Sequence, residues 1–247
     1  MIVVPVASRG QEASWHALMD LHEVLADAWV LVGGQMVHLH AAERGYPLVR
    51  PTDDADAVLD VKLQPTILHD VTAALVDMGF TSSGVAPSGA EHRWYRGDAQ
   101  IDLLIPQGLG ERLRAKVLGV SGSPTVETPA GQIAVDLSEL VDVQVGDRIG
   151  RVRRPTLMGA LIAKAAADTT VSVSGATAGR HLEDFVTMSA MLKVPDLAGS
   201  PSTKTQRRYV ARALGRVSSR TDLMEDHPDS RVGLARLARW VEQDDPK

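Results

Sequence analysis

The sequence contains no cysteine and no long apolar run. The absence of cysteine among its 247 residues excludes disulfide frameworks, thiolate metal sites and cysteine nucleophiles. No segment approaches the roughly 20 consecutive apolar residues that would span a bilayer. Residues 1–15 lack the basic start and the long apolar core of a signal peptide. We therefore expect a cytoplasmic protein that binds no membrane.

What is present is typical of a globular protein. Hydrophobic residues make up 44% of the chain and charged residues 23%, which excludes collagen-like and wholly disordered classes. The net charge of −5 hides an asymmetry, because residues 1–110 contain 6 basic and 14 acidic residues, whereas residues 111–220 contain 16 and 10. This distribution suits a site where carboxylates with metal ions face cations that hold a polyanion. Charges that only decorate solvated faces would give the same totals.

The spacing of apolar residues predicts an α/β front part and a helical back part. An apolar run at 29–32 ends at Gly33-Gly34 and leads into helix-forming residues, so we expect a strand, a tight turn and a helix. Gly97-Asp98 between two alternating segments predicts a hairpin. The expected strands are 29–32, 55–61, 92–96, 100–105, 133–145 and 149–153. The expected helices are 11–28, 35–44, 66–78, 107–118, 155–168, 181–192, 204–219 and 230–243. We expect a domain at 1–154 and a helical region at 155–247 that completes the active site.

Three aspartates form the main candidate site. Asp54 and Asp56 are two residues apart at the start of a strand, so both carboxylates point to the same face. Asp102 lies in an apolar strand, where an unpaired carboxylate is costly. If all three share a face, they could hold Mg²⁺, which prefers oxygen ligands. Taken singly, the aspartate pair is also common in turns and helix caps, and Gly33-Gly34 could be no more than a tight turn.

The order of these motifs is more specific than any of them alone. A strand with a Gly-Gly turn, then R-x-T-x-D-x-D at Arg50 to Asp56, then an apolar strand with one Asp resembles the nucleotidyltransferase superfamily. The similarity is closest to its AbiEii/MenT-like toxin branch. The resemblance implies a mixed sheet flanked by helices, followed by a C-terminal helical region. It also implies Mg²⁺ as the cofactor.

The resemblance implies roles for individual residues. Gly33 and Gly34 would let the backbone approach the triphosphate, and the hydroxyl of Thr52 would help to hold it. Asp54 and Asp56 would bind the metal. Asp102 would act as general base or complete the metal site.

The helical part supplies a second match, built on Lys164 and Asp184. Lys164 lies on an apolar helix, where a buried lysine needs an anionic partner. By resemblance it is the lysine that binds the nucleotide phosphates, and Asp184 is the aspartate of the last motif. Glu183 and Thr187 depart from the family pattern, which usually has Lys and often Asp there. Without the resemblance, Lys164 would snorkel to solvent and Asp184 would be an ordinary surface residue.

A row of arginines near the C-terminus is a candidate RNA-binding surface. Arg208, Arg212, Arg216 and Arg220 are spaced by four and line one helical face if the helix lasts that long. Such a stripe could contact RNA phosphates, and a solvated face paired with nearby acids explains it equally well. Aromatic residues make up 4% of the chain, so base stacking on single strands is not indicated. Recognition of a folded RNA by shape remains open.

These features predict a Mg²⁺-dependent nucleotidyltransferase that moves a nucleoside monophosphate from an NTP, such as ATP, CTP or GTP, to an acceptor hydroxyl. If the toxin branch is right, the acceptor is RNA, such as the 3′ end of tRNA, and a separate antitoxin protein is the partner. One alternative is an enzyme that modifies a small molecule, like aminoglycoside-modifying relatives. The other is a catalytically silent protein that binds a nucleotide or a partner, which Glu183 and Thr187 keep open.

Overall fold

The acidic strand predicted near residue 55 lies inside a mixed sheet of six strands. The computed structural model describes residues 1–47, 50–170, 179–198 and 203–243. The strands of the large sheet are β2 (Trp29–Val32), β3 (Asp54–Leu59), β4 (Thr81–Ser82), β5 (Arg93–Arg96), β6 (Ala99–Pro106) and β7 (Val126–Thr128). Their order is β2-β3-β6-β5-β4, and β7 pairs with the end of β6. β3 runs parallel to β6, whereas β2 and β5 run antiparallel to their neighbours.

A second sheet has three strands: β1 (Ile2–Val3), β8 (Ser138–Val145) and β9 (Arg148–Pro155). β8 and β9 form an antiparallel hairpin around Gly146-Asp147, and β1 pairs parallel to β8. β9 also contacts β2, so the small sheet packs beside the large one.

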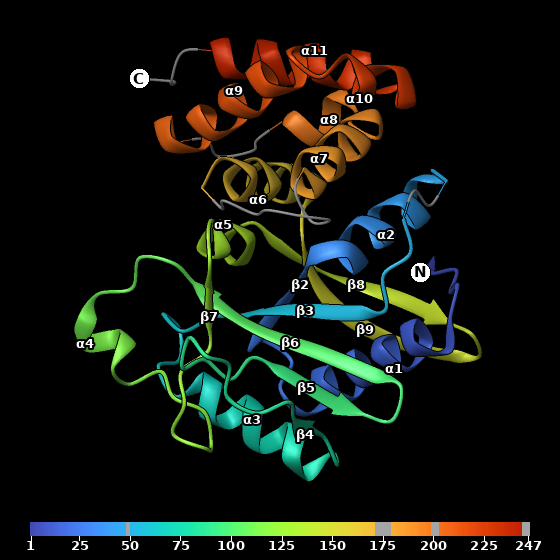
Figure 1. Cartoon of the computed structure of the whole chain (residues 1–247). Helices are drawn as coiled ribbons and strands as arrows, with labels where there is room; N and C mark the ends of the chain where they lie inside the picture. Colours follow the sequence, from blue (N-terminus) through green and yellow to red (C-terminus); the bar gives the residue numbers. More distant parts are fainter. Residues whose placement is uncertain (48–49, 171–178, 199–202, 244–247) are drawn as a thin grey trace.

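Helices cover the large sheet and then gather beyond one of its edges. The helices are α1 (Arg9–Val24), α2 (Gly33–Arg44), α3 (Ile67–Asp77), α4 (Glu111–Arg114), α5 (Gly131–Asp136), α6 (Leu157–Thr170), α7 (Arg180–Ala190), α8 (Val194–Leu197), α9 (Lys204–Ser218), α10 (Thr221–Asp226) and α11 (Ser230–Glu242). Figure 1 shows α6 to α11 as one group, with α2 between that group and β3. The cleft described below lies where α2, α6 and α7 meet the sheet.

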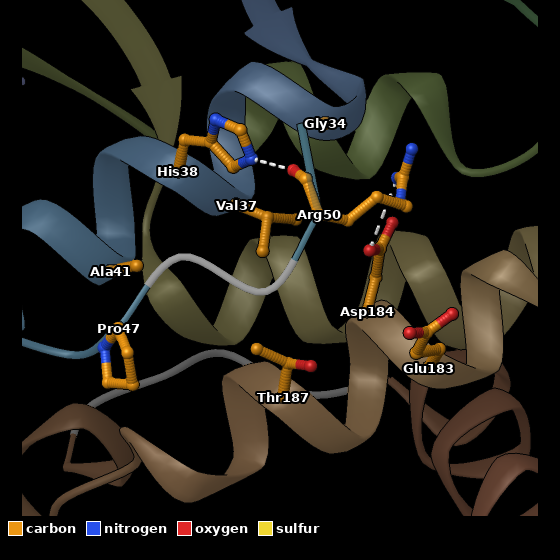
Figure 2. A pocket seen from close by; sticks show the side chains of 9 residues that line it. All are labelled: Gly34, Val37, His38, Ala41, Pro47, Arg50, Glu183, Asp184 and Thr187. Atoms are coloured by element: carbon orange, nitrogen blue, oxygen red, sulfur yellow. Dashed lines mark hydrogen bonds and ion pairs between the residues drawn. The ribbon is translucent and has the colours of Figure 1, made fainter. Parts of the chain in front are cut away.

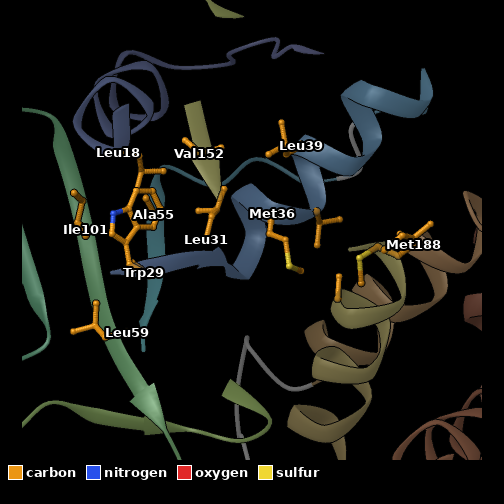
Figure 3. Packing of buried hydrophobic residues seen from close by; sticks show 14 of the residues in the cluster. Leu18, Trp29, Leu31, Met36, Leu39, Ala55, Leu59, Ile101, Val152 and Met188 are labelled. Atoms are coloured by element: carbon orange, nitrogen blue, oxygen red, sulfur yellow. The ribbon is translucent and has the colours of Figure 1, made fainter. Parts of the chain in front are cut away.

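The core explains why one face of β3 is left for polar chemistry. Leu18 of α1 packs with Trp29 of β2, Ala55 of β3 and Ile101 of β6, and all four side chains are fully buried (Figure 3). Because side chains alternate along a strand, this packing turns Asp54 and Asp56 to the opposite face. Burial of the apolar face therefore fixes the direction of both carboxylates.

Most of the predicted elements are confirmed, and three differ. α1 ends at Val24 because the chain needs residues 25–28 to turn back into β2. The helix predicted at 107–118 is only one turn long, α4, because the segment has no continuous apolar stripe and Leu113 alone packs against the core from this turn. The strand predicted at 133–145 is wrong in its first part, which forms α5. Packing of α5 against α6 there overrides the β-branched side chains Ile133 and Val135.

The fold class is confirmed: a mixed sheet flanked by helices is followed by C-terminal helices. β9 ends at Pro155, and every later element in the described part of the chain is helical. The division into domains at residue 154 stays a prediction. None of the described helices is long and apolar enough to cross a membrane.

Candidate active site

Three carboxylates meet on one face of the large sheet. Asp56 on β3 stands directly opposite Asp102 on β6, and Asp54 lies two residues before Asp56 on the same face. One carboxylate oxygen from each of the three lies within 4.8 Å of the other two. The structure thus brings together the three aspartates that the sequence selects.

Burial and charge repulsion both disfavour the charged form of Asp56. Burial, and next the nearby carboxylates of Asp54 and Asp102, raise the pKa of the Asp56 carboxyl to about 7. A divalent cation between the three would relieve this repulsion. The donor set, which consists of carboxylate oxygens alone, fits a hard cation such as Mg²⁺.

The two glycines at the start of α2 make room for these side chains. Gly33 has a φ of +69°, and a Cβ atom there would lie 1.7 Å from Oδ2 of Asp56. A Cβ atom on Gly34 would lie 2.7 Å from Cγ2 of Thr52. Only glycine allows the N-terminus of α2 to come this close to the carboxylates. Because free backbone N–H groups at a helix N-terminus attract anions, this end of α2 suits a phosphate group.

Thr52 lies beside the carboxylate cluster. Its hydroxyl donates a hydrogen bond to Oδ1 of Asp54 at 2.5 Å. Its carbonyl oxygen accepts a bond from the side chain of Gln35 on α2 at 2.8 Å. These two contacts tie the segment before β3 to α2 and orient Asp54.

Lys164 and Asp184 form a buried ion pair beside the carboxylate cluster. Nζ of Lys164 on α6 donates to Oδ2 of Asp184 on α7 at 2.6 Å, and each residue is only 6% exposed. The interpretations of a snorkelling lysine and of a surface aspartate are therefore wrong. Arg50 also reaches Asp184, with 3.5 Å between Nη2 and Oδ1. Asp184 thus holds two cations beside the cluster.

A small pocket next to this pair is lined by Arg50 and by the two residues of α7 that depart from the family pattern, Glu183 and Thr187. Figure 2 shows Arg50 between α2 and α7, where its carbonyl oxygen accepts a hydrogen bond from His38 and its guanidinium faces Asp184. Glu183 and Thr187 line this space together with Arg50. They do not line the larger neighbouring cleft, which contains the three carboxylates. The departures from the family pattern therefore lie beside the cleft and outside its described lining.

The carboxylates and the basic side chains line one cleft of about 730 Å³. Its lining residues are Gly33, Gly34, Arg50, Pro51, Thr52, Asp54, Asp56, Arg93, Asp102, Lys164, Arg180, His181 and Asp184. All the predicted catalytic, metal and nucleotide-binding residues are in this set. Four acidic and four basic side chains line the same space, which is the arrangement that a triphosphate with a divalent cation requires.

Three further residues line the cleft that no sequence motif indicates: Arg93, Arg180 and His181. Arg93 on β5 donates to both oxygens of Asp102, with 2.9 Å from Nε to Oδ1 and 2.7 Å from Nη2 to Oδ2. The hairpin carried the signal for this pair, because a two-residue turn at 97–98 pairs Arg93 with Asp102 by register. Burial, and next the charge of Lys164, lowers the pKa of His181 to about 4, so its imidazole is neutral near pH 7.

The predicted arginine stripe is only partly right. Arg208, Arg212 and Arg216 lie exposed on α9, but α9 ends at Ser218, so Arg220 is not on its face. Arg220 pairs with Asp222 at 2.5 Å, and Arg216 pairs with Asp168 at 2.9 Å. None of the four arginines is among the described lining residues of the cleft.

Comparison with known proteins identifies the class of fold. By sequence, no family model and no curated protein matches the chain. By structure, the chain is similar to the crystal structure of an antigenic nucleotidyltransferase-like protein from Paracoccidioides brasiliensis. The two are 14% identical, with a TM-score of 0.51 over 90% of this chain and 94% of the other. The chain therefore has a nucleotidyltransferase-like fold, whereas the AbiEii/MenT-like branch stays a prediction.

Proposed function

We propose that this protein is a Mg²⁺-dependent nucleotidyltransferase that transfers a nucleoside monophosphate from an NTP to an acceptor hydroxyl. One observation carries the proposal: three carboxylates within 4.8 Å of one another share a cleft with Lys164, Arg50 and the N-terminus of α2. The nucleotidyltransferase-like fold supports the same reaction class.

The reaction forms one bond and breaks another at the α-phosphorus. The acceptor oxygen bonds to the α-phosphorus, the bond to the bridging oxygen breaks, and pyrophosphate leaves with that electron pair. The acceptor hydroxyl releases its proton to a carboxylate or to water. Mg²⁺ held by Asp54, Asp56 and Asp102 would neutralise charge on the triphosphate and on the leaving pyrophosphate. The protein's own contribution is mainly positioning and electrostatic stabilisation.

The residues around the cluster have two roles: most bind the triphosphate, and one positions other side chains. The backbone N–H groups at Gly33 and Gly34, the hydroxyl of Thr52 and the ammonium of Lys164 bind the triphosphate. Asp184 is a positioning residue, because it fixes the ammonium of Lys164 and the guanidinium of Arg50 at the cleft wall.

Two roles are open to Asp102: it takes the acceptor proton, or it completes the metal site. Arg93 donates to both of its oxygens, and Gln100 donates to Oδ1 at 3.2 Å. These donors hold the carboxylate in one orientation, as the partners of metal ligands do. The contacts favour the second role, in which Asp102 is a fixed ligand.

The charge pairing in the cleft also supports a polyanionic acceptor. Among the described lining residues, Asp102 is paired with Arg93 and Asp184 with Lys164, while Asp54 and Asp56 are assigned to the metal. This leaves no carboxylate in the described lining for a cationic amine such as an aminoglycoside. We therefore propose RNA, such as the 3′ end of tRNA, as the acceptor, in a cytoplasmic toxin that is neutralised by a separate antitoxin protein.

The test is a transfer assay with matched aspartate variants. The protein is incubated with Mg²⁺, total tRNA and each of the four NTPs labelled at the α-phosphate. We expect label on tRNA with the wild type and with Asp53→Asn, whose exposed side chain accepts a bond from Ser8 outside the cleft. We expect none with Asp54→Asn. Transfer that survives Asp54→Asn contradicts the metal assignment, and NTP binding without transfer points to a small-molecule acceptor or a silent binding protein.

A further inference from the structure

A second pocket, here called the recess, lies beside the carboxylate cluster, and none of the proposed chemistry takes place in it. This recess has a volume of about 120 Å³ and lies between the sheet, α5 and α6. Its lining residues are Val32, Gly33, Met36, Asp56, Val58, Leu104, Thr128, Pro129, Ala130, Gly131, Ala134, Ala163, Lys164, Ala167 and His181. Gly33, Asp56, Lys164 and His181 also line the main cleft, so the two spaces share a wall.

Small side chains keep the recess open. Ala134 of α5 and Ala163 and Ala167 of α6 line it, where longer side chains would fill it. Gly131 lets the start of α5 pack closely on the end of β6, because a Cβ atom there would lie 3.0 Å from the Cα atom of Pro106. The chain passes the recess with Ala130 at a φ of +55°, the one positive value that a residue other than glycine adopts in the described part of the chain. Such strain persists where the surrounding structure imposes it, and it is frequent at ligand sites.

The lining defines the chemistry of a ligand. Away from the shared wall the recess is bounded mainly by aliphatic carbon, and Thr128 is the polar side chain on that side. The imidazole of His181 is neutral near pH 7. A flat, uncharged ring that is joined to a phosphate chain fits these surroundings. In an NTP, that group is the nucleobase.

The volume further restricts the base. An engineered apolar cavity of about 150 Å³ in another protein binds benzene, a single six-membered ring. A recess of about 120 Å³ therefore encloses one such ring and leaves part of a fused purine outside. We propose that this recess binds the pyrimidine ring of a CTP or UTP substrate. The inference rests on the proposed function and adds the class of nucleotide to it.

The first test compares ligands that share the phosphates and differ in the base. Calorimetry with the wild-type protein and Mg²⁺ measures the Kd of tripolyphosphate, CTP, UTP, ATP and GTP. We expect CTP and UTP to bind about tenfold more tightly than tripolyphosphate, because base burial adds to phosphate binding, and ATP and GTP to gain less. Equal affinity for all five ligands, or tighter binding of the purine nucleotides, overturns the inference.

The second test fills the recess. Ala163→Leu places a larger side chain into it from α6, and the same change at Ala211, exposed on α9, is the matched control. We expect Ala163→Leu to bind CTP no more tightly than tripolyphosphate, while Ala211→Leu keeps the wild-type difference. If circular dichroism shows that Ala163→Leu does not fold, Ala163→Val replaces it. A folded variant that keeps the full CTP advantage overturns the inference.

The two proposals fail in different ways. Transfer to an acceptor with no pyrimidine preference contradicts the recess and leaves the nucleotidyltransferase in place. A wild-type protein that binds neither tripolyphosphate nor any NTP contradicts the proposed function itself.

Discussion

Arg93 and Asp102 face each other on the antiparallel strands β5 and β6, and the guanidinium of Arg93 contacts both oxygens of the carboxylate. Asp102 in turn faces Asp56 across the parallel pair β6 and β3. One of the three carboxylates proposed to bind the metal is thus held in place by a side chain on the next strand. Partners of this kind orient metal ligands, and their loss typically lowers metal affinity or activity about 10- to 100-fold.

Replacing Arg93 should therefore lower turnover more than NTP binding. Arg93→Lys keeps a positive charge but loses the planar contact with both oxygens of Asp102. We expect kcat for transfer to fall about 10- to 100-fold, with a smaller change in the KM for the NTP. Arg112→Lys, at an exposed position of α4, is the control for the same chemical change. A loss confined to the KM for the NTP would show that Arg93 binds the nucleotide instead.

Asp56→Asn should change how stability depends on pH. The pKa of Asp56 is raised in the folded state to about 7 from an ordinary value of 3.8, so the folded protein binds this proton more tightly than the unfolded chain. Its contribution to stability is present at low pH and is lost as the pH rises through 7. Between pH 5 and 8 without Mg²⁺, we expect the wild type to lose about 2–3 kcal/mol relative to Asp56→Asn. Urea denaturation measures this, and parallel pH profiles would contradict it.

The Lys164–Asp184 pair should show strong coupling. Removing one partner leaves a buried charge without its main counter-charge, so Lys164→Met and Asp184→Asn should each destabilise the fold by about 3 kcal/mol. The double variant removes both charges, and we expect it to cost less than the sum of the two. A double-mutant cycle by urea denaturation measures the difference. Additive costs would mean that Arg50 and solvent compensate each charge separately.

Gly33→Ala should disrupt the metal site, whereas Gly45→Ala should not. Both glycines have similar positive φ values, +69° and +65°, so an alanine at either position costs about 1 kcal/mol of backbone strain. A Cβ atom at Gly45 meets nothing within 4 Å, but at Gly33 it strikes the Asp56 carboxylate. We expect calorimetry to show weaker Mg²⁺ binding in Gly33→Ala alone. Equal losses in both variants would mean that backbone strain, and not the collision, is responsible.

The exposed arginines of α9 give a test of RNA binding. Charge reversal at Arg208 and Arg212 should weaken tRNA binding and flatten its dependence on salt by about 0.7–0.9 per lost phosphate contact. The same reversal at Arg231 and Arg239 of α11, which line a separate surface groove, is the control. A salt dependence that stays unchanged after the α9 reversal would show that RNA, if bound, lies elsewhere.

Several local signals in the sequence predicted the fold correctly. The run at 29–32 with its glycines, the alternating strand with Asp54 and Asp56, and the hairpin at Gly97-Asp98 all depend on neighbours in sequence, and each is confirmed. The start of the predicted strand at 133 failed because contact with α6 decides its conformation. The propensities of neighbouring residues give no information about that long-range contact.

The candidate site was predictable in its residue types but not in its pairing. The order of Gly33, Asp54, Asp56 and Asp102 was enough to select residues that meet in one cleft. Whether Lys164 reached solvent or Asp184 depended on how α6 and α7 pack, which no short pattern encodes. Arg180 and His181 enter the cleft for the same reason.

The length of the turn at Gly97-Asp98 has a consequence for which insertions and deletions the chain can tolerate. The turn itself is exposed, and surface turns ordinarily accept changes in length. Here one added or missing residue would shift β5 by one position against β6 and exchange the faces of its side chains. Trp94, now in the core, would then point toward the carboxylates, and Arg93 would point into apolar packing. A change of length in this distant surface turn would therefore act as an active-site mutation.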